Sequence, residues 1–262
     1  MPNTLISLSH HGLLKISGSD AQKFLQGQLT CDVTKLQDTT SCMGAHCNPQ
    51  GRIISLFYLF QWQEAYYLVM LREMIPIALH ALKKYAIFYK TELNDVSNLF
   101  EIVGMTTTNT LVTNSIVTIP VTATRHMIIR EKQENTEPEK FHAHDDEWLC
   151  LDITDGIPHI HPATSSKFLP HELNLPALHA VSFDKGCYTG QEIIARMHYR
   201  GKLKQQLKSI ILTEPLPQPP IIGADLSQQL GDQQKMIGTI VDVCPQHPGY
   251  NQYHVLMVTN IS

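Results

Sequence analysis

The 262-residue sequence lacks the marks of several large protein classes. Its longest apolar run, residues 53–60, is interrupted by Ser55 and is far shorter than the ~20 residues that a membrane span requires. The first twenty residues have neither a cationic start nor an unbroken apolar block, so no secretion signal is expected. Hydrophobic residues still make up 43% of the chain, enough for a core shared by two or three subdomains. We therefore predict a soluble, cytoplasmic, globular protein without a membrane partner.

The usual nucleotide-binding glycine motifs are also missing. No Gly-x-x-x-x-Gly-Lys segment and no Gly-x-Gly-x-x-Gly fingerprint occurs, which argues against ATP or nicotinamide chemistry. The formal net charge of −4 disfavours general coating of nucleic acid, although it does not exclude a local basic groove.

No two of the six cysteines have the Cys-x-x-Cys spacing of a zinc ribbon or a dithiol redox motif. We predict that the cysteines are mostly reduced, and that five of them are buried free thiols: Cys31, Cys42, Cys47, Cys150 and Cys244. His142 and His144 stand beside two acids, a pattern seen in metal sites, but a polar loop explains them as well and is the interpretation that we favour. No metal site is predicted.

Local patterns predict strands and short helices in the first half of the chain. Strands are expected at residues 4–8 and 13–16 as a hairpin, and at 53–60 and 65–71 as a pair that follows a turn at 48–51. Ser19 and Gln22 have capping-box spacing for a helix over residues 20–26, and Gly27 is expected to end it. A second helix is expected from Pro76, with apolar residues at helical spacing: Ile75, Leu79, Leu82 and Ala86.

The second half is predicted to be richer in strands. Strands are expected at 111–121, 127–130 and 148–153, with a solvated loop at 131–140. Four prolines then mark a stiff link or a sheet edge: Pro215, Pro217, Pro219 and Pro220. β-branched runs follow at 237–243 and 253–258, so residues 205–262 are expected to form a small all-β module.

The segment 185–192, Lys-Gly-Cys-Tyr-Thr-Gly-Gln-Glu, carries the most chemical information. Thr189 and Glu192 have capping-box spacing, which predicts a helix from residue 190 to about 199 with Gly201 just past its end. Cys187 would lie two residues before the N-cap, near the positive end of the helix dipole, with Lys185 close by. Both positive influences favour a thiolate, so Cys187 is a candidate reactive thiol.

Positive charge gathers after this segment. Six cations and two acids lie in residues 184–208, a net charge of +4 within a chain of −4. Such an asymmetry suits a multiply anionic ligand, such as a glutamyl tail or phosphates. It is equally typical of a solvated helix end whose cations complement the dipole.

The segment 185–192 resembles the signature of the YgfZ family, the folate-binding relatives of the glycine-cleavage T-protein. The resemblance continues in chain order at residues 24–30 with Asp32, 45–47 with Gly51, 82–86, 148–149 leading to 156–158, 168–175 and 182–183. It covers most of the chain, and its central motif is specific. It implies an α+β fold of several subdomains around a central folate cavity, like that of the aminomethyltransferases, comprising residues 1–204 and a small C-terminal β-barrel at 205–262.

The family resemblance also implies a function and a set of site residues. It implies binding of tetrahydrofolate or a derivative, and a role in iron–sulfur cluster assembly or repair that affects tRNA modification indirectly. Iron–sulfur assembly proteins or their clients are the implied partners, with no direct contact to nucleic acid. Cys187 and Lys185 are the implied functional residues. The implied folate-binding residues are Trp148, Gln26, Gln28, Glu172, Tyr188, Arg200 and His11.

The chain also departs from its relatives, and these departures bear on two alternative functions. His11 stands where some relatives carry Trp, and the C-terminal module is shorter than in many of them. Aminomethyltransferases carry an Asp after the Asn-x-x-Gly turn, whereas residues 48–63 contain no carboxylate, so folate-dependent aminomethyl transfer would lack general acid–base support. An RNA-binding module using the cations of 196–208 ranks third, because Tyr199 is the only aromatic residue among them.

Overall fold

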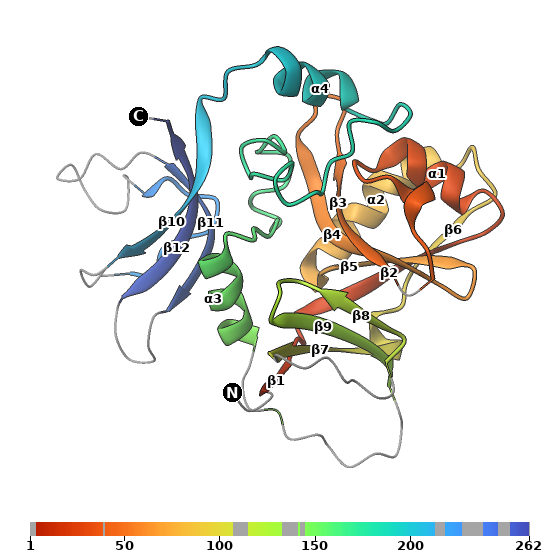
Figure 1. Ribbon diagram of the computed structural model, residues 1–262, viewed down its shortest axis with the longest axis horizontal. Helices are drawn as coiled ribbons and strands as arrows, with labels where there is room; N and C mark the ends of the chain where they lie inside the picture. Colours follow the sequence, from red (N-terminus) through yellow and green to blue (C-terminus); the bar gives the residue numbers. More distant parts are fainter. Residues whose placement is uncertain are drawn as a thin grey trace.

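Three antiparallel sheets organise the molecule, with helices between and around them (Figure 1). The computed structural model describes residues 4–38, 40–106, 115–132, 141, 145–212, 218–226, 238–245 and 252–261. Its mixed helix and sheet content agrees with the α+β prediction. No helix in these ranges is long and apolar enough to cross a membrane.

The largest sheet has five strands in the order β3-β4-β5-β2-β6. These strands are β2 (His11–Ser17), β3 (Ser41–Cys47), β4 (Ile53–Trp62), β5 (Ala65–Leu71) and β6 (Glu92–Asp95). The predicted pairing of residues 53–60 with 65–71 is confirmed by the β4–β5 ladder. The turn at 48–51 is confirmed too, since Gly51 N donates to Asn48 O at 2.8 Å.

Alternation along the strands gives this sheet two buried faces. Leu14, Leu68 and Met70 belong to a core beneath α1 (Ala21–Gln28) and α2 (Ile75–Ala86). Leu13 and Val69, which point the other way, belong to a second core shared with the next sheet. The helix predicted from Pro76 is confirmed as α2, and short 3-10 turns connect the elements at Val33–Lys35 (η1), Arg72–Met74 (η2) and Ser97–Leu99 (η3).

The second sheet has the order β1-β7-β9-β8 and packs against that second core. Its strands are β1 (Thr4–Ser7), β7 (Phe100–Thr106), β8 (Val117–Pro120) and β9 (Arg125–Glu131). The hairpin predicted for the first two strands is wrong, because β1 pairs with β7 while β2 pairs with β5 and β6 in the other sheet. The sharp bend between β1 and β2 therefore joins the two sheets of a sandwich.

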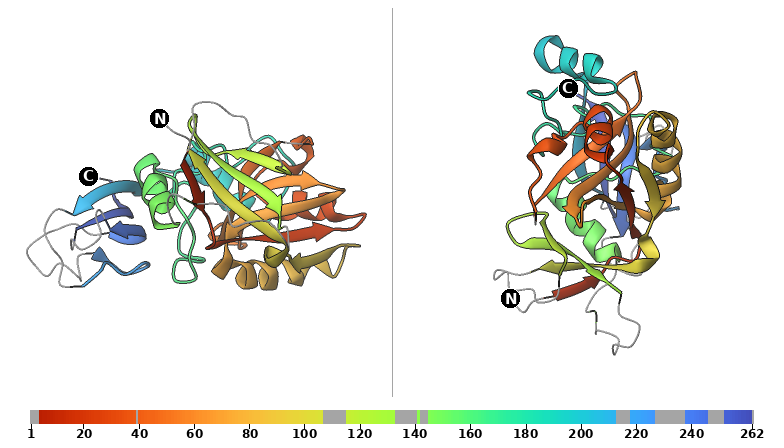
Figure 2. Two further views of the ribbon diagram at one scale, coloured as in Figure 1. Left: turned by 90° about the horizontal axis from the view of Figure 1, so that it is seen from below. Right: turned by 90° about the vertical axis from the view of Figure 1, so that its right-hand side faces the viewer.

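Residues 148–153, predicted as a strand, lie within helix α3 (Asp145–Asp155). Three acids in its first turn complement the helix dipole. Trp148 and Leu151 pack on the sandwich, whereas Leu149, Cys150 and Ile153 pack on the C-terminal sheet. Figure 2 shows that the helix lies between two sheets, so it carries apolar residues on two sides. Its sequence therefore lacks the single apolar stripe at helical spacing by which a helix is recognised.

The C-terminal module is a three-stranded sheet in the described residues. Its order is β10-β12-β11, with β10 (Gln205–Leu212), β11 (Gly238–Pro245) and β12 (Tyr253–Asn260), so the strands predicted at 237–243 and 253–258 are confirmed. The register of β11 shifts between Ile240 and Asp242.

Two predicted helix starts differ in detail. The first helix, α1, runs through Gly27 to Gln28, and the Asp20 side chain accepts from Lys90 N at 2.8 Å instead of capping it. The later helix, α4 (Gln191–Arg200), is followed by Gly201 as predicted, but Gly190 is its N-cap and no capping box forms.

The prediction that Cys150 and Cys244 are free thiols is wrong. Cys150 of α3 and Cys244 of β11 form a disulfide, with 5.5 Å between their Cα atoms. Sequence spacing could not reveal the pair, because the two residues are 94 positions apart. Cys31 and Cys47 are buried free thiols, as predicted, and Cys42 is a free thiol that is only partly buried.

Several predictions fall on residues outside the described ranges. These are 111–114 of the predicted strand at 111–121, most of the loop at 131–140, the pair His142 and His144, and the two prolines Pro215 and Pro217.

Candidate functional site

A cavity of about 480 Å³ lies where the sandwich, α3 and the segment after α3 meet. Its size falls within the range of about 300–1,000 Å³ that is typical of small-molecule sites. The cavity draws its walls from four separate parts of the chain. Its lining residues are Ser9, His10, His11, Leu71, Arg72, Glu73, Asp145, Asp146, Trp148, Leu149, His159 and His161.

Trp148 forms an apolar wall of this cavity. Its side chain is buried, and its ring lies directly over Gly104 of β7, where a Cβ atom would come within 2.4 Å of the indole. The Arg125 guanidinium lies 4.8 Å from the centre of the ring. Gly104 and Arg125 hold the indole in place, and the indole gives this wall of the cavity its aromatic character.

His11 contributes an unpaired polar atom to the same cavity. It begins β2, and its ring centre lies 6.0 Å from that of His159. Burial, together with the charge on His159, lowers the pKa of His11 to about 3, so the ring is neutral at physiological pH. Its Nδ1 atom is buried and has no hydrogen-bond partner in the described residues.

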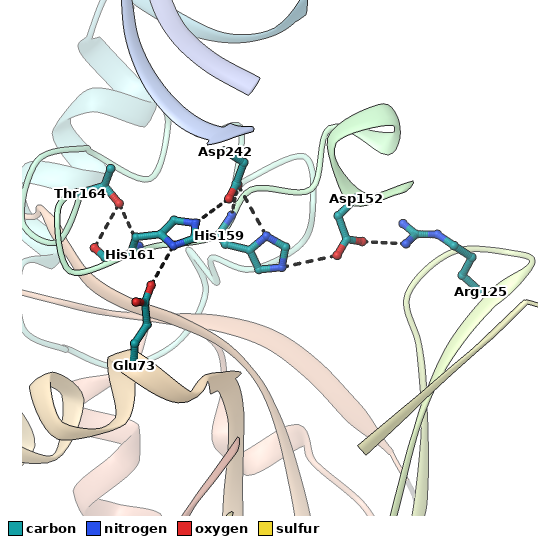
Figure 3. Close-up of polar contacts among 7 residues, drawn as sticks. All are labelled: Glu73, Arg125, Asp152, His159, His161, Thr164 and Asp242. Atoms are coloured by element: carbon teal, nitrogen blue, oxygen red, sulfur yellow. Dashed lines mark hydrogen bonds and ion pairs between the residues drawn. The ribbon is translucent and has the colours of Figure 1, made fainter. Parts of the chain in front are cut away.

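A chain of alternating charges borders the cavity (Figure 3). The His161 ring is held between Glu73 Oε1, 2.9 Å from Nδ1, and Asp242 Oδ1, 2.6 Å from Nε2. The backbone N–H of His159 donates to Asp242 Oδ2 at 2.8 Å, and its ring nitrogens lie 3.5 Å from Asp242 and 3.4 Å from Asp152. Asp242, on β11, thus ties the C-terminal sheet to two cavity histidines.

These contacts determine the protonation of the histidines. Burial works against charge, but Asp242 and Asp152 raise the pKa of His159 to about 9. His161 also has a raised pKa, because Asp242 and Glu73 outweigh its burial. The two histidines in turn keep the pKa of Asp242 below its ordinary range despite complete burial. The cavity therefore combines a neutral imidazole at His11 with protonated imidazoles behind it.

Arg125 forms two ion pairs at the Asp152 end of this row of charged residues. Arg125 donates to Asp152 at 2.8 Å and to Asp155 at 2.6 Å, both on α3. Burial raises the pKa of Asp152, although His159 and Arg125 oppose the shift. The same arginine lies over Trp148, so one residue positions both the charged and the aromatic parts of the wall.

The signature segment 185–192 packs on α1, apart from the residues that line this cavity. Lys185 is buried, and its Nζ donates to the carbonyls of Leu29 and Cys31 at 2.7 Å each. Burial lowers the pKa of Lys185 to about 8. Lys185 therefore holds the segment in place, while Cys187 is exposed and stands three residues before the N-cap of α4.

Glycine is required inside this segment. Gly190 has φ +85°, and a Cβ atom there would lie 2.6 Å from the Asn48 carbonyl oxygen in the β3–β4 turn. Thr189 N donates to Gly27 O, and its hydroxyl donates to Gln28 Oε1 at 3.2 Å. The segment thus joins α1, the turn and α4, and these contacts present the Cys187 thiol on the surface.

Of the predicted folate-binding residues, the structure brings Trp148 and His11 together at the cavity. The others lie elsewhere in the described structure. Both amide atoms of Gln26 hold the loop after α1, and Glu172 accepts from Leu169 N at 2.8 Å. Gln28 and Tyr188 are buried at the signature segment, and Arg200 is exposed at the end of α4. Their contact with folate stays a prediction.

Sequence analysis missed the charged residues around the cavity: Glu73, His159, His161 and Asp242. His159 and His161 directly follow the Gly156-Ile157-Pro158 motif, and this position is the sequence feature that could have identified them as candidate site residues. Their carboxylate partners come from η2 and β11, a pairing that only the fold reveals.

Comparison with solved structures defines the class of protein. The fold matches the glycine cleavage system aminomethyltransferase T from Bartonella henselae with a TM-score of 0.67 over 98% of this chain and 78% of that chain, at 13% identity. The chain therefore has the aminomethyltransferase T fold. A search of protein-family models finds no match.

Curated sequences identify the family within that fold. The chain is 35% identical to the tRNA-modifying protein YgfZ of Photorhabdus laumondii over 92% of its length and 80% of the relative's. It is 32% identical to that of Sodalis glossinidius over 95% and 83%. An uncharacterized protein of Haemophilus influenzae is 35% identical over 90% and 82%. The chain belongs to the YgfZ family.

Proposed function

We propose that this protein binds tetrahydrofolate or a derivative in the central cavity and acts as an accessory protein in iron–sulfur cluster assembly or repair. The observation that carries the proposal is the cavity itself, with an indole wall at Trp148 and an unpaired buried imidazole nitrogen at His11. A pterin offers a flat ring for the first and polar ring atoms for the second. When bound, the folate would supply one-carbon or redox chemistry, and these residues would orient it.

The proposal assigns Cys187 as the functional thiol, with the effect on tRNA modification arising indirectly through enzymes that depend on iron–sulfur clusters. Exposure supports this role, because a thiol on the surface can reach a partner protein. Lys185 acts by positioning the segment that carries the thiol. Relatives of this chain are named tRNA-modifying proteins, which agrees with an effect on tRNA without requiring direct contact with nucleic acid.

The proposal also covers the domain organisation and the location of the protein. Residues 1–204 form the folate-binding region, and residues 205–262 form the C-terminal module, which we propose closes into a small barrel. β10 begins at Gln205, directly after the proposed boundary. A cytoplasmic location fits the proposed iron–sulfur partners.

The folate part is tested by isothermal titration calorimetry with tetrahydrofolate. Trp148→Phe should weaken binding by about three- to tenfold, because it removes part of the aromatic contact. Trp62→Phe is the matched control, since Trp62 packs in the sandwich core and is not among the residues that line the cavity. Absence of tetrahydrofolate binding by the wild-type protein, or equal weakening by the two variants, would contradict the proposed site.

The thiol part is tested in cells that lack their own YgfZ-family gene. Cys187→Ser should fail to restore iron–sulfur-dependent tRNA thiolation, measured by nucleoside mass spectrometry, while tetrahydrofolate binding by the purified variant is unchanged. Cys42→Ser, at a partly buried thiol outside the signature, should restore it. Full restoration by Cys187→Ser would show that this thiol is not the functional group.

A folate-dependent aminomethyltransferase is the second candidate, and the fold match to aminomethyltransferase T favours it. Residues 48–63 form the β3–β4 turn, the β4 strand and the turn after it, and they contain no carboxylate to support proton transfer. Turnover of an aminomethyl-lipoyl donor with tetrahydrofolate would establish this activity. We expect none.

A further inference from the structure

A disulfide joins the helix that carries a cavity wall residue to the strand whose Asp242 holds two cavity histidines. Cys150 lies on α3, two residues after the cavity wall residue Trp148. Cys244 lies on β11, two residues after Asp242, which holds both cavity histidines. The cross-link therefore ties the C-terminal sheet to the helix that forms the cavity wall.

The two sulfur-bearing residues differ in their access to solvent. Cys244 is 1% exposed and packs in a small apolar cluster with Ile153 and Leu256. Cys150 packs at the edge of this cluster and is only partly buried. Cys150 is therefore the more accessible of the two residues, and access governs which sulfur is attacked in thiol–disulfide exchange.

We propose that Cys150 and Cys244 form a reversible redox site for small thiols of the glutathione class, and that its state controls how firmly the C-terminal sheet is held to α3 and to the cavity histidines. A thiolate RS⁻ attacks the Cys150 sulfur, which forms a mixed disulfide there and releases Cys244 as a thiolate. A second RS⁻ attacks the R sulfur of the mixed disulfide, which releases Cys150 as a thiolate and RSSR. With two protons taken up by the cysteines, the protein disulfide is reduced while two RSH are oxidised to RSSR.

The contacts on the two sides of the disulfide indicate which side would loosen. On the sandwich side, α3 keeps the Trp148 packing and the ion pairs of Arg125 with Asp152 and Asp155. On the other side, β11 keeps a small apolar cluster, the packing of Val241 in the main core and the contacts of Asp242 with the histidines. Reduction should therefore loosen the C-terminal sheet and leave α3 in place on the sandwich, which weakens the support that Asp242 gives to the cavity histidines.

Hydrogen exchange measured by mass spectrometry tests this without any ligand. Protein purified without reductant is compared with the same protein after treatment with reduced glutathione, and reactive thiols are mapped by alkylation. The exposed Cys187 should be alkylated in both states and the buried Cys47 in neither, which calibrates the mapping. Glutathione should appear on Cys150 in the intermediate, and not on Cys244.

Exchange in β11 and β12 should accelerate by at least about tenfold on reduction, with β4 and β5 unchanged. Cys150→Ser should show the fast exchange without glutathione and should not respond to it. If that variant does not fold, the wild-type comparison alone decides. Free Cys150 and Cys244 in the untreated protein would overturn the proposal, and so would reduction that leaves exchange in β11 and β12 unchanged. Neither result depends on whether the protein binds folate.

Discussion

Replacing Asp242 by asparagine should destabilise the protein most at pH values where its histidine partners are charged. Asp242 is completely buried and accepts hydrogen bonds from His159 and His161. Raising the His159 pKa from its ordinary value near 6.5 to about 9 corresponds to about 3 kcal/mol of folding free energy. Asparagine keeps the shape but removes the larger of the two carboxylate contributions to this shift, the other being that of Asp152, so most of that amount should be lost.

The sign of the pH dependence follows from the direction of the pKa shift. A group whose pKa is raised by folding contributes fully below its unfolded pKa of about 6.5, and the contribution is lost as the pH rises through about 9. Asp242, with a lowered pKa, loses its contribution only in acid, below its unfolded pKa of about 4. Wild-type stability should therefore fall between about pH 6.5 and 9, and Asp242→Asn should flatten this fall.

Urea unfolding followed by circular dichroism measures both effects. The difference between wild type and Asp242→Asn should be about 3 kcal/mol at about pH 6 and under about 1 kcal/mol at about pH 9.5. Asp184→Asn, at an exposed acid, should change little at either pH. A loss of equal size at both pH values, or no loss, would refute the charge-based explanation.

Three further substitutions test the packing, each by urea unfolding without reductant. Gly190→Ala should lower the free energy of unfolding by about 2 kcal/mol or more, because φ is +85° and the new Cβ would meet the Asn48 carbonyl; an unchanged midpoint would contradict this. Gly104→Ala should cost about 1–3 kcal/mol by displacing the Trp148 ring and should weaken tetrahydrofolate binding; retained affinity would count against the Trp148 wall. Cys244→Ser breaks a cross-link between residues 94 positions apart and should cost about 2–4 kcal/mol; equal stability of the oxidised wild type would contradict this.

Local sequence patterns correctly predicted the elements that pair with, or are bounded by, residues close to them in the sequence. The β4–β5 pair follows its turn directly, and the Pro76 helix has one apolar face over one core. The signature segment predicted a helix ending before Gly201, and α4 ends at Arg200, although its N-cap is Gly190 and no capping box forms. In these cases short-range sequence determines the structure.

Local sequence patterns did not predict the structure where contacts with residues far away in the sequence determine it. The α3 helix reads as a strand because Trp148 and Leu149 face different sheets. His11 and Trp148 were found through a family resemblance, but the Asp242 contact that charges the cavity histidines comes from a strand more than eighty residues after His159. Such a pairing leaves no local pattern.

The cavity and the exposed thiol are two separate features of this family member. Trp148 and His11 line the cavity that we propose for folate, whereas Cys187 is presented at the N-terminal side of α4. A ligand in the cavity would contact the charged histidines behind His11, and through Asp242 it would sense the position of the C-terminal sheet. The account therefore places folate and thiol chemistry in different parts of the molecule.

A crystal structure of the protein with tetrahydrofolate tests the central claim most directly. The account predicts a pterin that lies in the cavity against the indole of Trp148 and within hydrogen-bond distance of His11 Nδ1. Folate bound outside this cavity, or a cavity that stays empty at a concentration of folate that saturates the protein in solution, would contradict it.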